Sequence, residues 1–186
     1  MTSSIKRGAF IVFEGCDRCG KSTQSRLLVE HLQKSAIPVK HMVFPERTSD
    51  IGKLINGYLT NKQDLNDETI HLLFAANRWE HKNEILKLLK DGTTLVVDRY
   101  SYSGIVYSAA KADALLDRGN YGEERYEKRE FQIKVAKMFE DIYEKEKEYW
   151  YQIDARQNPE DIHAKIKEKF EEVLRQAQTN DVSKLK

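Results

Sequence analysis

The chain has 186 residues, of which 33% are charged, and a formal net charge of +1. This length suits one domain with its own hydrophobic core, and the balanced charge argues against a nucleic-acid-binding surface. No apolar run is long enough to span a bilayer, and residues 1–8 lack the apolar core of a signal peptide. We expect a single cytoplasmic domain over residues 1–186 without membrane or nucleic-acid partners, and a nuclear or mitochondrial pool is also compatible with the sequence.

The first predicted strand, Ala9 to Glu14, is followed by Gly15-Cys16-Asp17-Arg18-Cys19-Gly20-Lys21-Ser22-Thr23 and by a predicted helix from Gln24 to Lys34. Strand, G-x-x-x-x-G-K-S and helix in this order are typical of a phosphate-binding loop. The glycines allow successive backbone N–H groups to point inward at the start of the helix, where they bind anions. Lys21 can bind the β- and γ-phosphates, and the Ser22 hydroxyl can ligate Mg²⁺. The segment predicts a nucleotide-phosphate site.

Cys16 and Cys19 are the only cysteines of the chain, and they form a C-x-x-C inside this loop. Such a pair can indicate a redox site or half of a zinc site. No second Cys or His pair accompanies it, so we interpret both as small loop residues rather than metal ligands. We hypothesise that oxidation of either cysteine disturbs the loop.

Further strands are predicted at residues 38–44, 93–98 and 149–154, separated by helices at about 48–58, 66–90, 101–117, 127–147 and 160–176. Alternating strands and helices predict an α/β fold, here a P-loop three-layer sandwich with a parallel sheet of four strands flanked by helices. In such sheets the site lies beyond the carboxyl ends of the strands. This rule places Glu14, the phosphate loop, Phe44 to Arg47 and Asp98-Arg99 close together.

Two further patterns concern substrate binding. Phe74 and Arg78 are four apart in a predicted helix, so they share a face and can stack on a nucleobase while hydrogen-bonding its edge. Spacing alone favours the alternative of a core Phe74 and a surface Arg78. Asp98, at the end of a buried strand, suits a role in ordering Mg²⁺ or phosphate, and Arg99 beside it suits a phosphate ligand.

Residues 118–127 form a Gly-interrupted segment rich in basic and aromatic side chains. A loop of this composition can close over phosphates and exclude water, and it is equally compatible with a surface turn.

Together these segments resemble thymidylate kinases of the eukaryotic and poxviral type. The matching stretches, in chain order, are Ile-Val-Phe-Glu-Gly-x-Asp-Arg-x-Gly-Lys-Ser-Thr-Gln, Phe-Pro-Glu-Arg, Leu-Leu-Phe-x-Ala-Asn-Arg-Trp-Glu, Val-Asp-Arg-Tyr-x-x-Ser-Gly and Gly-x-x-Glu-Arg-Tyr-Glu. The resemblance implies transfer of the γ-phosphoryl group of ATP to thymidine monophosphate (dTMP) with Mg²⁺, and a homodimer. Such a transfer needs positioning and charge neutralisation rather than a covalent intermediate.

The resemblance also implies roles for individual residues. The catalytic residues would be Arg18, Lys21, Asp98 and Arg99. ATP would be bound by Gly15, Cys16, Asp17, Arg18, Cys19, Gly20, Lys21, Ser22 and Thr23, with Arg118 and Arg125 in a lid over residues 118–127 and Arg156 near adenine. The dTMP site would comprise Asp17, Phe44, Arg47, Phe74, Arg78, Arg99, Ser103, Gly104, Tyr107 and Tyr126. Mg²⁺ would be held directly by Ser22 and indirectly by Asp98.

One departure from the family stands out. After Lys111 the family carries roughly thirty more residues, including a strand that pairs with the first one, so that its sheet has five strands where we expect four here. Residues 149–154 would have to shift onto the first strand, or its N–H and C=O groups would stay unpaired. A catalytically impaired variant that only binds nucleotide therefore stays open beside a working enzyme.

Two other functions also stay open. One is a kinase for another nucleoside monophosphate, against which Phe74, Arg78 and Asp17-Arg18 argue. The other is a GTPase, since Asn61-Lys62-Gln63-Asp64 matches the guanine-reading motif by letters but not by context.

Overall fold

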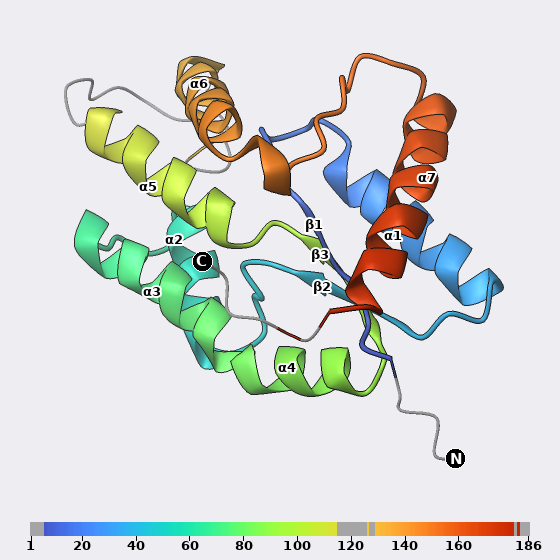
Figure 1. The fold of residues 1–186 in the computed structure, drawn as a ribbon. Coiled ribbons are helices and arrows are strands. Elements are labelled where there is room, and N and C mark those ends of the chain that lie inside the picture. Colours follow the sequence, from blue (N-terminus) through green and yellow to red (C-terminus); the bar gives the residue numbers. More distant parts are fainter. Residues whose placement is uncertain (1–5, 115–125, 127–128, 181, 183–186) are drawn as a thin grey trace.

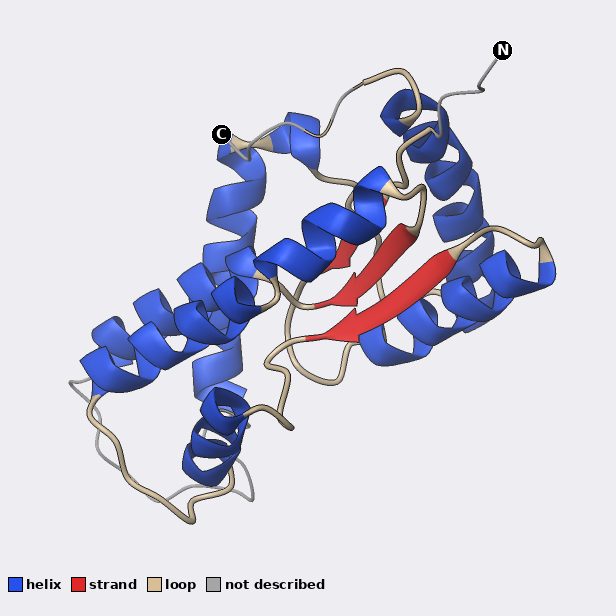
Figure 2. Cartoon of the chain, turned by 90° about the horizontal axis from the view of Figure 1, so that it is seen from below, coloured by secondary structure: helices blue, strands red, loops and turns tan. Residues whose placement is uncertain are grey.

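The computed structural model describes residues 6–114, 126, 129–180 and 182. In this part of the chain, three parallel strands form one sheet in the order β1-β3-β2 (Figures 1 and 2). The strands are β1 (Phe10–Phe13), β2 (Val39–Val43) and β3 (Thr94–Asp98). All five residues of the central β3 are buried, as expected of an apolar strand covered on both faces.

Helices follow each strand and surround the sheet. They are α1 (Lys21–Lys34), α2 (Asp50–Leu59), α3 (Asp67–Glu80), α4 (Lys82–Lys90), α5 (Ser101–Ala114), α6 (Arg129–Lys145) and α7 (Pro159–Ala177). Three of them begin at side-chain caps of residue types that favour this position: Ser49 accepts from Gly52 N, Asn66 from Thr69 N and Asn158 from Glu160 N. None of the described helices is long and apolar enough to cross a bilayer.

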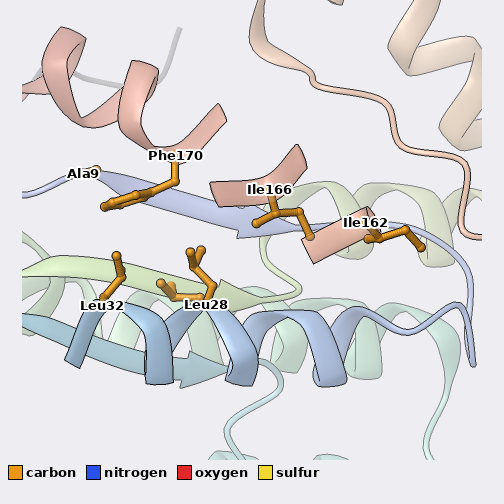
Figure 3. Packing of buried hydrophobic residues seen from close by; sticks show 7 residues of the cluster. Ala9, Leu28, Leu32, Ile162, Ile166 and Phe170 are labelled. Atoms are coloured by element: carbon orange, nitrogen blue, oxygen red, sulfur yellow. The ribbon is translucent and has the colours of Figure 1, made fainter. Parts of the chain in front are cut away.

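One face of the sheet is covered by α1 and α7, which lie side by side in Figure 1. From α1, Leu28 and Leu32 point toward the sheet, and α7 contributes a stripe at four-residue spacing, as Figure 3 shows: Ile162, Ile166 and Phe170. Val96 of β3 belongs to this cluster. Its neighbours Leu95 and Val97 pack on the opposite face with α4, as the two-residue period of a strand requires.

Two helix pairs extend the core beyond the sheet. The pair α5 and α6 buries Val106 and Ala110 against Val135 and Phe139. The pair α2 and α3 encloses a second cluster around Ile55, Tyr58, Leu59 and Ile70. These pairs flank the carboxyl ends of the strands, so they form the walls of any site at that edge.

The prediction of a single helix over residues 66–90 is wrong in one respect, because the chain bends at His81. The His81 N–H donates to Arg78 O at 3.3 Å, a tighter turn than an α-helix makes. His81 thereby ends α3 and precedes α4. After this bend α4 buries Ile85 and Leu89 against the sheet, which one straight helix would carry past it.

The predicted fourth strand, residues 149–154, is also wrong. Tyr149 ends a short 3₁₀ helix (Lys147–Tyr149) and the following residues are irregular. Although this segment and β1 are both described, no backbone hydrogen bond joins them. Side-chain packing holds the segment instead: the Trp150 ring lies 4.6 Å from that of Tyr102, and Ile153 packs against the α1–α7 cluster. One edge of β1 is therefore without a ladder partner among the described residues.

The register of the sheet brings the strand ends together. Asp98 pairs with Phe13 of β1 and with Val43 of β2, so all three strands end at one level. The phosphate loop, the Phe44–Arg47 turn and Arg99 all start at this edge, as the rule for open α/β sheets predicts.

Candidate nucleotide-binding site

The phosphate loop connects β1 to α1 through three residues of positive φ: Gly15 (137°), Arg18 (59°) and Gly20 (86°). Glycine adopts such angles without the clash that a Cβ causes, which accounts for the two glycines of the motif. Arg18 is not glycine, and a left-handed arginine costs about 1–2 kcal/mol. Its side chain is exposed at the tip of the loop.

Lys21 and Ser22 open α1 beneath this loop. The Lys21 ammonium is nearly buried and donates to Cys16 O and, at 3.4 Å, to Cys19 Sγ. The Ser22 hydroxyl donates to Asp98 Oδ2, and the other carboxylate oxygen, Oδ1, is buried without a hydrogen-bond partner. Buried polar atoms normally have a partner, so Asp98 Oδ1 has room for one more donor or for a metal-bound water.

Glu14 connects β1 to the start of α5. Its carboxylate accepts from Tyr100 N at 2.9 Å, from Ser103 N at 3.1 Å and from the Ser103 hydroxyl. These N–H groups have no partner within the helix. Burial raises the pKa of Glu14 above its ordinary value, while the bonds from Ser103 and Tyr100 oppose that shift. Glu14 thus fixes α5 relative to the phosphate loop.

Arg99 contacts four other residues of the site. It follows β3 with a φ of 66°, and its guanidinium donates to Gly15 O at 3.0 Å, to Ser103 Oγ and Tyr107 Oη at 3.3 Å, and to the Asp17 carboxylate. Strained residues held by many partners cluster at functional sites. Burial raises the pKa of the Tyr107 phenol, and the neighbouring Arg99 guanidinium, which lowers this pKa, does not offset the effect of burial. Tyr107 therefore stays neutral.

A cavity of about 610 Å³ opens next to the loop. All ten residues predicted to bind dTMP line it, and they come from five separate parts of the chain: Asp17, Phe44, Arg47, Phe74, Arg78, Arg99, Ser103, Gly104, Tyr107 and Tyr126. Its lining also includes Asp67, His71, Ser108 and Lys111. A volume of this order suits a ligand of nucleotide size.

Phe74 and Arg78 lie on the same face of α3 and border this cavity. Arg78 also lies directly against Gly104 of α5, where an added Cβ would come within 2.8 Å of the guanidinium nitrogens. Gly104 therefore leaves the space that Arg78 occupies. Burial lowers the pKa of Arg78 from its ordinary value, and the side chain remains a cation at neutral pH.

Two residues that the sequence did not single out organise the site. Gln132 of α6 accepts from Asp17 N at 2.9 Å and donates to Asp17 Oδ2 at 2.6 Å and to Tyr126 O at 2.8 Å. It fixes both the backbone and the carboxylate of Asp17. A lone glutamine in a charged helix carries no sequence signal.

Asn77 of α3 is the second of these residues, and it is fully buried. It accepts from Glu46 N at 2.8 Å and donates to Glu46 O at 3.0 Å and to Glu80 Oε1 at 2.7 Å. It thereby holds the Phe44–Arg47 turn against α3. A buried asparagine inside the quoted Ala-Asn-Arg-Trp-Glu stretch was the available signal.

Asn77→Ala is expected to lower the free energy of unfolding by about 2–4 kcal/mol, because it leaves the Glu46 N–H and C=O without partners. It should also raise the KM for dTMP, the substrate that the resemblance implies, since Phe44 and Arg47 belong to the released turn. Urea denaturation and steady-state kinetics measure the two effects. Asn83→Ala, an exposed asparagine on α4, is the control and should change neither. Equal stabilities of the two variants would contradict the role of Asn77.

Several predicted residues lie elsewhere. Arg156 is not part of the cavity lining; its guanidinium pairs with Asp154 at 2.8 Å, and 90% of its side chain is exposed. Arg118, Arg125 and the lid expected over 118–127 lie outside the described residues, Tyr126 excepted. Asn61 to Asp64 follows helix α2 rather than a strand, so the match to a guanine-reading motif has the wrong context.

A parallel sheet with a phosphate loop after its first strand, beside a nucleotide-sized cavity, defines a P-loop nucleotide-binding protein of the kinase type. The family model "Thymidylate kinase" matches residues 13–120. The chain is 44% identical to a thymidylate kinase of Plasmodium falciparum, over 89% of this chain and 91% of that protein. It is 38% identical to the one of Homo sapiens, over 98% and 99% respectively.

Solved structures agree with these matches. A thymidylate kinase from Candida albicans superposes with a TM-score of 0.79 at 32% identity, covering 94% of this chain and 96% of that chain. The chain belongs to the thymidylate kinase family.

The length difference expected from the sequence is visible in these matches. The alignment with the human enzyme extends over 209 positions, 23 more than the 186 residues of this chain. At least 23 positions of that alignment therefore have no counterpart here. Such a gap agrees with the absence of a strand beside β1 in the described residues.

Proposed function

We propose that this chain transfers the γ-phosphoryl group of ATP to dTMP, giving ADP and thymidine diphosphate. The observation that carries this proposal is the cavity beside the phosphate loop, lined by all ten residues expected to bind dTMP. Membership of the thymidylate kinase family supports the same reaction.

In the ATP half of the site, the N–H groups of residues 15–23 surround the β-phosphate at the start of α1. Lys21 releases Cys16 O and turns its ammonium to the β- and γ-phosphates. Arg18, at the tip of the loop, neutralises the transferring group. We assign Arg156 to adenine and the lid arginines Arg118 and Arg125 to the phosphates, as the family resemblance implies.

Mg²⁺ fits the pair formed by Ser22 and Asp98. Ser22 would hold the ion through its hydroxyl, and the unpartnered Asp98 Oδ1 would order it through a bound water. The ion neutralises charge on the phosphate oxygens of ATP.

In the dTMP half, Phe74 stacks on thymine and Arg78 hydrogen-bonds its edge, while Phe44 borders the base. Arg47 and Arg99 bind the phosphate of dTMP, and Asp17 accepts from the sugar 3′-hydroxyl. Ser103, Gly104, Tyr107 and Tyr126 enclose the sugar and base. The acceptor is a phosphate oxygen of dTMP, and cationic side chains hold it in line with the γ-phosphate of ATP. The transfer therefore needs no strong base.

We further propose a cytoplasmic homodimer formed through helices α3 and α5. Leu72 and Trp79 are seven residues apart on α3 and about two-thirds exposed, and Ile105 of α5 is 54% exposed. Exposed apolar side chains of this size on neighbouring helices indicate an interface. Sedimentation equilibrium should give twice the monomer mass, and a monomer at micromolar concentration would contradict the dimer.

The decisive experiment measures ADP release by the purified chain with Mg·ATP and a panel of monophosphates: dTMP, dUMP, AMP and dGMP. We expect turnover with dTMP and loss of turnover on chelation of Mg²⁺. Turnover with AMP or dGMP alone would overturn the base site at Phe74 and Arg78. Cooperative unfolding and ATP binding without turnover would favour the impaired variant, the alternative raised by the segment that the family carries after Lys111 and this chain lacks.

A further inference from the structure

Both cysteines of the chain lie in the phosphate loop, and neither thiol has a role in the transfer reaction, to which these residues contribute backbone N–H groups only. Each sulfur is half-buried and free. The chain contains no other cysteine, so any thiol chemistry of this protein takes place at the loop that binds ATP.

The loop brings the two cysteines to the ends of one tight turn. Asp17 and Arg18 form its centre, with Arg18 left-handed, and Cys16 and Cys19 flank it. The residues that flank such a turn have Cα atoms less than about 7 Å apart, and disulfides span about 4.4–6.8 Å between Cα atoms. The Cys19 thiol already points back across the turn and donates to Cys16 O at 3.1 Å.

The surroundings of the two sulfurs differ. Cys19 Sγ lies 3.4 Å from the Lys21 ammonium, and it faces Gly15, where an added Cβ would lie 3.6 Å from it. The ammonium can donate to this sulfur and stabilise the negative charge that develops on it during a nucleophilic attack. Burial raises the pKa of the Cys16 thiol, so Cys16 is the less reactive of the two.

We propose that the phosphate loop is a thiol switch, in which peroxide oxidises Cys19 and Cys16 then closes a disulfide across the turn. The chemistry does not depend on the proposed function, whereas its effect on ATP rests on that function.

In the first step the Cys19 sulfur attacks one oxygen of hydrogen peroxide. The O–O bond breaks, the sulfur becomes a sulfenic acid, and the released hydroxide takes the former thiol proton to form water. In the second step the Cys16 sulfur attacks the Cys19 sulfur, the S–O bond breaks and the hydroxyl leaves as water with the Cys16 proton. Two thiols are oxidised to one disulfide, and one peroxide is reduced to two waters.

The disulfide would act on the site through Lys21. The ammonium loses its contact with the Cys19 thiol, and the turn that presents Asp17 and Arg18 is locked by a covalent bond. Phosphate binding requires the Lys21 ammonium to leave Cys16 O and the turn to adjust around the ligand. A covalent bond across the turn opposes this adjustment and so weakens binding. We expect ATP to bind at least about tenfold more weakly to the oxidised chain, and a thiol reductant to restore binding.

The test treats the reduced full-length chain with hydrogen peroxide. Intact-mass analysis and thiol titration should show a monomer that has lost two hydrogen atoms and both thiols. ATP affinity is measured before and after, each sample being compared with its own reduced form. Two unreacted thiols, or disulfides only between chains, would overturn the switch. A disulfide formed without loss of ATP affinity would overturn its regulatory effect, and absence of ATP binding before oxidation would refute the proposed function instead.

Single variants test the order of the steps. Cys16→Ser should stop at a sulfenic acid on Cys19, trapped by dimedone, with no disulfide within the chain. Cys19→Ser should react more slowly than Cys16→Ser under the same peroxide concentration, because the remaining thiol lacks the Lys21 contact. Lys21→Met should slow oxidation of Cys19 in the Cys16→Ser background. Faster reaction of Cys16 than of Cys19 would contradict the assignment of Cys19 as the attacking thiol.

Discussion

Arg99→Met is expected to lower kcat/KM for dTMP by about 10³-fold, equivalent to about 4 kcal/mol of transition-state stabilisation. In the proposed reaction Arg99 binds the phosphate of dTMP with a planar, always charged group. In the structure it also contacts Gly15 O, Ser103, Tyr107 and the Asp17 carboxylate. The substitution therefore removes a phosphate ligand and leaves Asp17 without its cation.

A second substitution separates the charge of Arg99 from the geometry of its several N–H donors. Arg99→Lys keeps the charge but loses the fork of donors, so its activity should lie between those of the wild type and Arg99→Met. Arg175→Met, on an exposed arginine of α7, is the matched control and should retain wild-type kinetics. Steady-state kinetics with varied dTMP measures all three. A methionine variant within tenfold of wild type would place the phosphate of dTMP elsewhere.

The second large effect is expected from Gly104→Ala. The new Cβ would lie 2.8 Å from the guanidinium nitrogens of Arg78, so this flexible side chain must move. Because Arg78 hydrogen-bonds thymine in the proposed complex, we expect kcat/KM for dTMP to fall about 10²-fold, the loss of about 3 kcal/mol. The backbone is helical here, so Ala in place of Gly should leave the free energy of unfolding unchanged or raise it by about 0.5–1 kcal/mol.

Loss of activity without loss of stability distinguishes this mechanism from general damage. Gly57→Ala makes the same change inside α2, where the added Cβ meets only the flexible Gln63 side chain, and it should leave dTMP kinetics unaltered. Thermal unfolding and initial-rate measurements are made on both variants. Normal kinetics of Gly104→Ala would show that the position of Arg78 does not control recognition of thymine.

Much of the fold follows from local patterns. The glycines and Lys21-Ser22 of the phosphate loop, the apolar run of β3 and the caps Ser49 and Asn66 each depend on neighbours a few residues away. Such signals are fixed by backbone geometry and helix-end chemistry. The edge of the sheet where the site lies followed from the chain order of strands and helices alone.

Other features depend on contacts between distant segments. Residues 149–154 are rich in aromatic side chains, which strands favour. Trp150 nevertheless packs on Tyr102 of α5 and Phe139 of α6, and no ladder forms with β1. The break at His81 likewise follows from packing, because α4 must turn to bury Ile85 and Leu89. The spacing of residues along the chain predicts neither feature. Each depends on which arrangement of the segment buries more apolar surface against the rest of the fold.

The sequence by itself determined the phosphate loop, the α/β class, the family, and which side chains to look for around a nucleotide. Only the tertiary structure decided that the ten residues expected to bind dTMP line one cavity, and that Asn77 and Gln132 hold Glu46 and Asp17 in place. The physical reason is range. Backbone conformation and capping act over a few residues, whereas hydrogen bonds such as Gln132 to Asp17 join positions more than a hundred residues apart and exist only once the helices have packed.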